Sequence, residues 1–278
     1  MKKLITTLGF VVAATIAVSQ VPAIHVEKKG RGTPVIFLPG FTTPGSVWNE
    51  TIQNLAGQAE SHLVSYAGFN GNAPIEMPWY ETIKKELLDY VREKDLTTIR
   101  IIGHSMGGNL AVDLAAEAPE RVESVILVDA IPCMRELMMP GVPAESLQYD
   151  SPYNKQMLEM DEAAFRQNAA TMAQYMTNNS EKVAAVTAWS IAADRKTYVY
   201  GFTDLLKLDL RPALKNVKAR TLILGAPFPG KDVVLANFEK QYENLEAKTI
   251  EIAPDSKHFI MFDQPEWFYD KVNKFLFQ

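Results

Sequence analysis

T-T-I-R-I-I-G-H-S-M-G-G-N-L-A-V-D, residues 97–113, reads as a strand that turns sharply into a helix. The isoleucines of its first half are β-branched and bounded by turn formers, which is typical of a short buried strand. Residues 109–116 are mostly good helix formers. Ser105 is therefore predicted to stand on the turn between the two elements.

Two glycines frame this serine in the pattern G-x-S-x-G. Gly103 and Gly107 flank Ser105, because a turn this tight leaves no room for Cβ atoms beside a strained residue. Such a turn exposes the hydroxyl and aims the first amides of the helix at a reacting oxygen. The pattern also occurs by chance in glycine-containing loops, but the strand before it and the helix after it favour a functional interpretation.

In this context, the chain from residue 24 onward resembles the α/β-hydrolase family. Short apolar runs alternate with segments of helical spacing along most of the chain, which predicts a mostly parallel sheet with helices on both faces. The expected strands are residues 24–27, 34–38, 61–66, 99–102, 122–128, 221–224 and 249–252.

The resemblance also implies a division of the chain. Residues 24–132 and 204–278 would form the hydrolase core, and residues 133–203 an inserted helical cap. In the cap segment the alternation of strands and helices stops and methionine is frequent. These adaptable side chains would either line a wide apolar cavity or pack between helices, and the sequence leaves both open.

Residues 1–23 have the features of a secretory signal peptide. A basic start at residues 1–3 precedes an apolar run at residues 4–18, and small residues suited to cleavage follow. The run is shorter than the roughly 20 residues of a membrane-spanning helix, so we expect no stable membrane anchor. An uncleaved anchor is the alternative. The mature protein is expected to be exported, either periplasmic or secreted.

Composition argues against several classes of function. The net charge of −5 argues against a nucleic-acid partner, which would call for a basic stripe. The four histidines are scattered without metal-ligand spacing, so no metal or cofactor is expected. Cys133 is the only cysteine. No internal disulfide can form, and we expect the Cys133 thiol to pack as a small hydrophobe.

His258 is the predicted catalytic partner of Ser105. A serine hydroxyl is a poor nucleophile at neutral pH, and a neutral imidazole can take and return its proton. His258 follows the last expected strand, where the resembled family carries its base. The other histidines, His25, His62 and His104, lie before the nucleophile in the chain.

The carboxylate that would orient His258 has two candidates. Asp129 ends the strand after the nucleophile helix, where a subset of the family places its acid, although an aspartate there can also simply cap the loop. Asp232 follows the strand that most often supplies the acid in the family. However, the family usually places this aspartate earlier in the loop, at the position that Phe228 occupies here. We predict Asp129 and keep Asp232 as the alternative.

The resemblance implies two backbone donors for a reacting oxyanion. They are the amide of Met106, next to the nucleophile, and the amide of Phe41, in the loop after the strand at residues 34–38. Pro39 stands where the family usually has a histidine. This replacement would alter the shape of the loop and would leave the Phe41 amide in place as a donor. Alternatively, this loop serves only to pack the Phe41 ring.

Together these residues imply an exported serine hydrolase acting on esters, lactones or thioesters of small, largely apolar acyl compounds through an acyl-enzyme. A serine nucleophile disfavours dehalogenase and epoxide-hydrolase reactions, which need a carboxylate to form an alkyl ester. An amidase, a peptidase, a carbon–carbon hydrolase or an acyltransferase would use the same site. A ligand-binding protein that keeps the site for recognition is a further alternative, and the complete set of residues argues against it.

Overall fold

The computed structural model describes residues 21–278. The predicted signal peptide, residues 1–23, lies outside the described residues except for its last three positions. No helix within the described part is long and apolar enough to cross a membrane.

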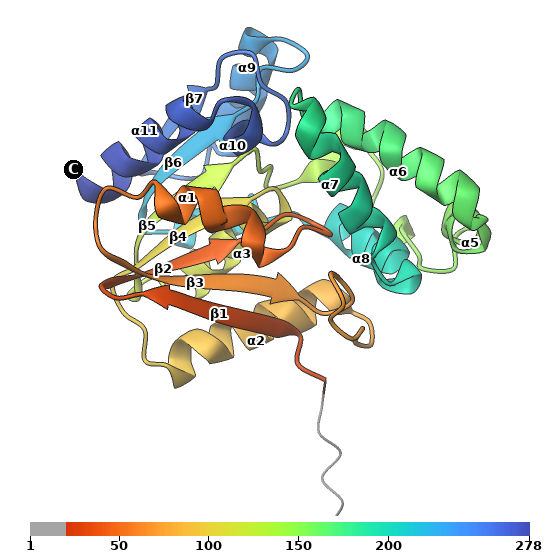
Figure 1. Cartoon of the computed structure of the whole chain (residues 1–278), viewed down its shortest axis with the longest axis horizontal. Helices are drawn as coiled ribbons and strands as arrows, with labels where there is room; N and C mark the ends of the chain where they lie inside the picture. Colours follow the sequence, from red (N-terminus) through yellow and green to blue (C-terminus); the bar gives the residue numbers. More distant parts are fainter. Residues whose placement is uncertain (1–20) are drawn as a thin grey trace, which may run out of the picture.

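Seven strands form one sheet in the order β1-β3-β2-β4-β5-β6-β7. β1 is antiparallel to β3, and every other neighbouring pair is parallel (Figure 1). The strands are β1 (Ile24–Gly30), β2 (Thr33–Leu38), β3 (Ala59–Tyr66), β4 (Ile99–His104), β5 (Val122–Val128), β6 (Arg220–Gly225) and β7 (Lys248–Ile252).

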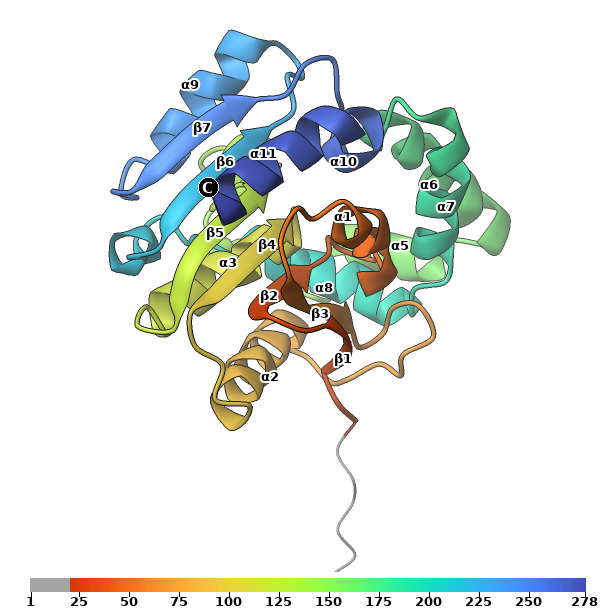
Figure 2. The same ribbon diagram turned by 60° about the vertical axis from the view of Figure 1, so that its left-hand side comes forward.

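Helices cover both faces of this sheet. α2, α3 and α9 share one buried apolar cluster with the strands, and α1 and α11 belong to a second one. Alternate residues of β2 point into the two clusters, Ile36 into the first and Phe37 into the second, so the clusters lie on opposite faces. Figure 2 shows α11 crossing in front of the strands. This confirms the predicted mostly parallel sheet with helices on both faces.

The helices around the sheet differ in length. They are η1 (Gly45–Trp48), α1 (Asn49–Gln53), α2 (Trp79–Glu93), α3 (Met106–Glu117), η3 (Ala213–Asn216), α9 (Lys231–Gln241), α10 (Ile260–Asp263) and α11 (Pro265–Phe277), where η marks a 3-10 helix.

A group of helices stands between β5 and β6 in the chain, and we call residues 134–207 the helical insertion. Figures 1 and 2 both show α5, α6 and α7 gathered to one side of the sheet. Its elements are α4 (Met134–Met138), η2 (Ala144–Ser146), α5 (Pro152–Glu159), α6 (Glu162–Met176), α7 (Ser180–Ile191) and α8 (Arg195–Lys207).

α8 differs from the helix that the family resemblance implies for this part of the chain. The resemblance implies a helix over residues 204–217 that returns the chain to the sheet, whereas α8 begins at Arg195 and ends at Lys207. The Asp194 side chain accepts a hydrogen bond from the Thr197 amide and fixes the earlier start. Pro212 disfavours helical geometry in the residue before it, so the chain beyond Lys207 forms only the short 3-10 helix η3.

The register of the parallel strands brings their carboxyl ends to one edge. His104 of β4 pairs with Val128 of β5, and Val128 pairs with Leu224 of β6. The residues that follow these strands therefore meet at this edge, among them Ser105 after β4 and Asp129 after β5.

Candidate active site

Ser105 stands on a strained turn between β4 and α3. Its φ is 53° and its ψ is −122°, a backbone conformation that residues with side chains rarely adopt. Its amide donates to the Val128 carbonyl at 2.9 Å, and its own carbonyl accepts from the Gly108 amide at 2.8 Å. The turn is thus held from both sides.

Both glycines of the G-x-S-x-G pattern are required by close backbone contacts. A Cβ on Gly107 would lie 2.1 Å from the Leu38 carbonyl oxygen. A Cβ on Gly103 would lie 2.3 Å from the Gly107 carbonyl oxygen. No side chain fits at either place, which is the reason that the sequence pattern suggested.

His258 lies between β7 and α10, and its ring contacts Asp129. The His258 Nδ1 atom is 2.6 Å from Asp129 Oδ2. Because an ionised carboxylate can only accept, Nδ1 carries the proton and Nε2 is left with a lone pair. The second carboxylate oxygen, Oδ1, accepts a hydrogen bond from the Ala226 amide at 2.9 Å. Both oxygens of Asp129 are therefore fixed in place.

Of the two candidate carboxylates, it is Asp129 that contacts His258. Asp232 lies in the first turn of α9 with its residue exposed, and no hydrogen bond or ion pair of its side chain is found within residues 21–278. The loop before α9 turns outward, since 77% of Phe228 is exposed. The catalytic roles themselves stay predictions, and the geometry agrees with the choice of Asp129.

The predicted oxyanion donors flank Ser105. Met106 is the first residue of α3, and the Phe41 loop approaches Ser105 through Gly40, where a Cβ would lie 3.4 Å from the Ser105 Cβ. Among the described residues, neither the Phe41 nor the Met106 amide donates to another residue of the chain. Neither amide is therefore committed to a hydrogen bond within the described part of the protein.

The ring of Phe41 also packs, as the alternative interpretation expected. It makes edge-on contacts with Phe69 and Trp79, at ring-centroid distances of 4.9 and 5.6 Å. Two residues of α8 in the helical insertion, Tyr198 and Phe202, contact it at 5.8 and 5.9 Å. The Phe41 loop is therefore anchored by aromatic rings from both the hydrolase core and the insertion.

The segment that carries His258 is tied to the helical insertion as well. Asp263 accepts hydrogen bonds from the Lys257 amide at 2.7 Å and from the Asn178 amide at 2.9 Å. The Phe259 amide donates to the Met176 carbonyl at 3.0 Å. Sequence reasoning did not single out Asp263, because an aspartate in a helix turn carries no motif.

Within residues 21–278 no group of three histidine, cysteine or acidic side chains is placed to hold a metal ion. Cys133 is buried with a free thiol, as a packed small side chain would be.

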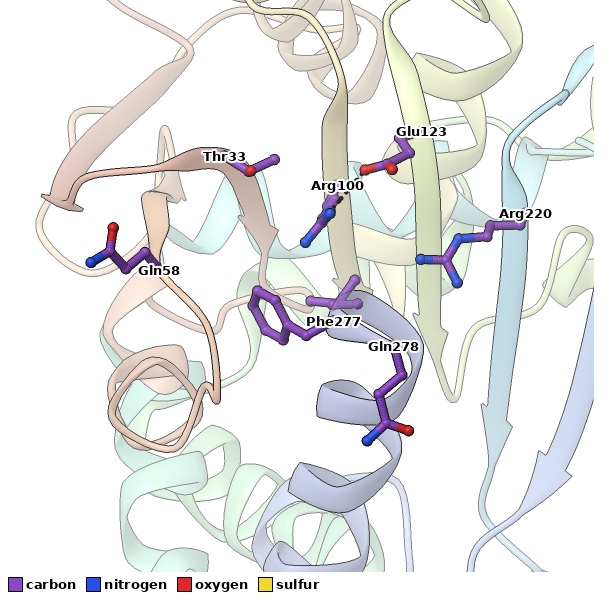
Figure 3. Close-up of a pocket in the computed structure, with 8 residues that line it drawn as sticks. Thr33, Gln58, Arg100, Glu123, Arg220, Phe277 and Gln278 are labelled. Atoms are coloured by element: carbon purple, nitrogen blue, oxygen red, sulfur yellow. Dashed lines mark hydrogen bonds and ion pairs between the residues drawn. The ribbon is translucent and has the colours of Figure 1, made fainter.

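A pocket of about 410 Å³ lies away from these residues (Figure 3). It is lined by Thr33, Arg100, Glu123 and Arg220, from the amino-terminal halves of β2, β4, β5 and β6, and by the end of α11. This is the edge of the sheet opposite to Ser105. The Arg100 guanidinium pairs with Glu123 at 2.8 Å, so part of the charge in this pocket is already neutralised.

Comparison with known proteins identifies the family of this chain. A family model described as alpha/beta hydrolase family matches residues 35–271. The pimeloyl-[acyl-carrier protein] methyl ester esterase of Nitrosospira multiformis is 24% identical over 277 residues, covering 91% of this chain and 98% of the relative. The enzyme of the same name from Legionella pneumophila strain Paris is 35% identical over 123 residues, which cover 44% of this chain and 48% of the relative.

Solved structures resemble the chain over most of its length. An esterase from Exiguobacterium antarcticum superposes with a TM-score of 0.74 at 19% identity, covering 92% of this chain and 97% of the other. An enol-lactonase from Burkholderia xenovorans LB400 superposes with a TM-score of 0.73 at 16% identity, covering 92% of this chain and 95% of the other. At these identities the likeness concerns the fold.

Proposed function

Because the chain belongs to the alpha/beta hydrolase family, we propose that it is a serine hydrolase that cleaves esters of small, largely apolar acyl compounds, lactones and thioesters included. The observation that carries the proposal is the 2.6 Å contact of His258 Nδ1 with Asp129 beside the strained turn of Ser105. The named activity of the relatives, hydrolysis of a methyl ester, supports the ester class.

The reaction would run through an acyl-enzyme. His258 Nε2 accepts the Ser105 proton as the serine oxygen attacks the carbonyl carbon, and the Phe41 and Met106 amides stabilise the oxyanion. The tetrahedral intermediate collapses, and the leaving alcohol takes the proton from His258. Water then gives a proton to His258 and attacks the acyl group, which frees the acid and restores the Ser105 hydroxyl.

Asp129 acts through His258 in this scheme. Its carboxylate holds the imidazole in the tautomer with Nδ1 protonated and stabilises the imidazolium that forms during each transfer. The Ala226 amide keeps the carboxylate oriented by holding its other oxygen.

The rings beside the oxyanion loop support an apolar acyl group. Phe69 and Trp79 are fully buried around Phe41, and Tyr198 and Phe202 are partly buried. A carbonyl bound by the Phe41 amide would lie close to these apolar surfaces, because ring and amide belong to one residue.

Steady-state assays with short-chain nitrophenyl esters test the proposal. We expect repeated turnover of the esters, and no turnover of the matching nitroanilides above about a hundredth of that rate, because an amide leaving group is harder to expel. A ligand-binding protein would release at most one equivalent of nitrophenol per site. Preferential turnover of the nitroanilides would instead identify an amidase.

We further propose that the mature protein begins after Ser19 or Ala23 and functions outside the cytoplasm. The basic start, the short apolar run and the small residues that end it support this. N-terminal sequencing of the exported protein would show the new start. Recovery of a chain beginning at Met1 from the membrane fraction would show an anchor instead.

A further inference from the structure

His104 is a buried histidine that the proposed reaction does not use. It is the last residue of β4, directly before Ser105, and only 1% of it is exposed. Its ring centroid lies 4.5 Å from that of His258 and 4.7 Å from that of Phe259. The side chain therefore fills the space between the nucleophile strand and the segment that carries the base.

The two ring nitrogens of His104 have different surroundings. Nε2 is 3.0 Å from the backbone carbonyl oxygen of His258. Since a carbonyl oxygen can only accept, Nε2 carries the proton and donates. Nδ1 is buried and has no hydrogen-bond partner within the described residues.

The unpartnered nitrogen faces the oxyanion loop. A Cβ on Gly40 would lie 2.8 Å from His104 Nδ1, so the loop can approach this closely only because residue 40 is glycine. One imidazole thus touches the strand before Ser105, the His258 backbone and the loop before Phe41. These are the three segments whose spacing the reaction would require.

We propose that His104 is a positioning residue that fixes the spacing between Ser105, His258 and the oxyanion loop, an inference that rests on the proposed serine mechanism. Its Nε2–H holds the backbone of His258 against the end of β4. Misplacing a reacting group by about 1 Å commonly lowers turnover about a hundredfold.

A purely structural role explains the contacts less well. An apolar side chain of similar size would fill the same space without leaving a buried nitrogen unpaired. Other bonds hold the neighbours of the base, through Lys257 to Asp263 and through Phe259 to Met176. Among the described residues, the His104 side chain is the one that donates to the carbonyl of His258 itself.

The protonation state of His104 suits this task. Burial and the neighbouring His258 hold the pKa of His104 well below its usual value, so its ring stays neutral. A neutral ring does not oppose the positive charge that His258 gains during proton transfer, and it keeps Nδ1 without a proton next to Gly40.

The test compares His104→Leu, which removes the donor, with His104→Gln, whose amide N–H lies at about the reach of Nε2. On nitrophenyl esters we expect kcat of His104→Leu to fall about a hundredfold with KM within about threefold, because binding contacts are unchanged. His104→Gln should stay within about tenfold of the parent kcat. Equal kcat values for Leu and Gln variants at matched folded fractions would overturn the proposal.

A second readout follows the geometry without turnover. We expect the proton of the His258 Nδ1–H···Asp129 hydrogen bond to give a strongly deshielded NMR signal, and Asp129→Asn should identify this signal by removing it. We expect this signal to broaden or vanish in His104→Leu and to persist in His104→Gln. A sharp, unshifted signal in a folded His104→Leu variant would show that the geometry of His258 and Asp129 does not depend on His104.

These readouts distinguish a failure of the positioning role of His104 from a failure of the proposed ester hydrolysis. If the parent protein turns over no ester, the proposed function fails, and the NMR signal still tests the positioning role. If the parent is active and His104→Leu is equally active, only the positioning role fails. Should His104→Leu not fold, His104→Met provides a more adaptable side chain without a donor, with the same expected losses.

Discussion

α3 of the hydrolase core and α7 of the helical insertion have the same length, twelve residues, but they are stabilised differently. Nine residues of α3 are buried, and no side chain caps its start. In α7 only Val186 is buried, and the Asn179 side chain accepts a hydrogen bond from the Glu181 amide at the start. One helix is held by burial and the other by a local polar cap.

The difference in capping, though not in burial, extends to neighbouring helices. α5, α6 and α8 also begin with a side-chain cap, from Ser151, Asp161 and Asp194, whereas α2, α9 and α11 do not. Of the methionines in the insertion, Met157 alone is buried. A cap fixes where a helix begins without fixing what it packs against. The starts of these insertion helices are therefore fixed locally.

The two regions also contribute differently to the candidate site. Ser105 and Asp129 both have a positive φ, 53° and 45°, and are fixed by the backbone at the end of the sheet. The insertion contributes through side chains and backbone groups that hold the Phe41 loop and the His258 segment. We infer that the core carries the chemistry and that the insertion adjusts its geometry, and four predictions test this comparison.

The largest effect is expected for Ser105→Ala. Loss of the attacking oxygen should lower kcat by several orders of magnitude, as for other triad nucleophiles. A fluorophosphonate should label the parent and not the variant, while the thermal unfolding curve stays similar because little volume is removed. Labelling that persists, or activity within about tenfold of the parent, would contradict the assignment.

The second prediction compares two aspartates of the core. Asp129→Asn should lower kcat about 10⁴-fold, because it favours the wrong His258 tautomer and removes the charge that stabilises the imidazolium. Asp232→Asn serves as the matched control and should stay within about twofold, since its exposed side chain touches none of the candidate catalytic residues. The reverse ranking in steady-state kinetics would assign the role to Asp232.

The third prediction concerns a buried charge in α3. Burial raises the pKa of Asp113 to about 6, and the Tyr80 hydroxyl donates to its carboxyl group at 2.8 Å. In the unfolded chain the pKa is about 4, so between these values the folded protein keeps a proton that the unfolded chain releases. This contribution to stability is fully present below about pH 4 and is lost as the pH rises through about 6.

Urea unfolding at two pH values measures the contribution of Asp113 to the free energy of unfolding. From pH 4.5 to pH 8, the free energy of unfolding of the parent should fall by about 2 kcal/mol relative to that of Asp113→Asn, which cannot titrate there. Parallel pH profiles for the two proteins would show that Asp113 is ionised in the fold already at low pH. Esterase activity of the variant should remain, because Asp113 is not placed in the site.

The smallest effect is expected in the insertion. Tyr198→Ala removes one ring that contacts Phe41 at 5.8 Å, and we expect kcat/KM to fall about tenfold as the Phe41 amide loses its fixed position. Tyr175→Ala on α6 is the control, because 70% of Tyr175 is exposed and its loss should change kcat/KM less than about twofold. Equal activity of the two variants would show that the insertion does not position the oxyanion loop.

Much of the fold was readable from local sequence. Gly103 and Gly107 predicted the turn at Ser105, because their lack of a Cβ is needed by backbone atoms only a few residues away or on the adjoining strand. The alternation of apolar strands with helical spacing predicted a parallel sheet, since strands buried on both faces need continuous apolar runs. The family resemblance pointed to His258 through its place after the last strand, and its catalytic role stays a prediction.

The contact between Asp129 and His258 and the contacts of the His104 ring required three dimensions. Asp129 and His258 are 129 positions apart, and nothing in either neighbourhood records the distance between them. The sequence around His104 gives no sign of its partner. The contact of its ring with the His258 carbonyl is visible only in the folded chain. Turns and caps act within a few residues and leave a sequence pattern, whereas contacts across the sheet edge depend on the register of whole strands.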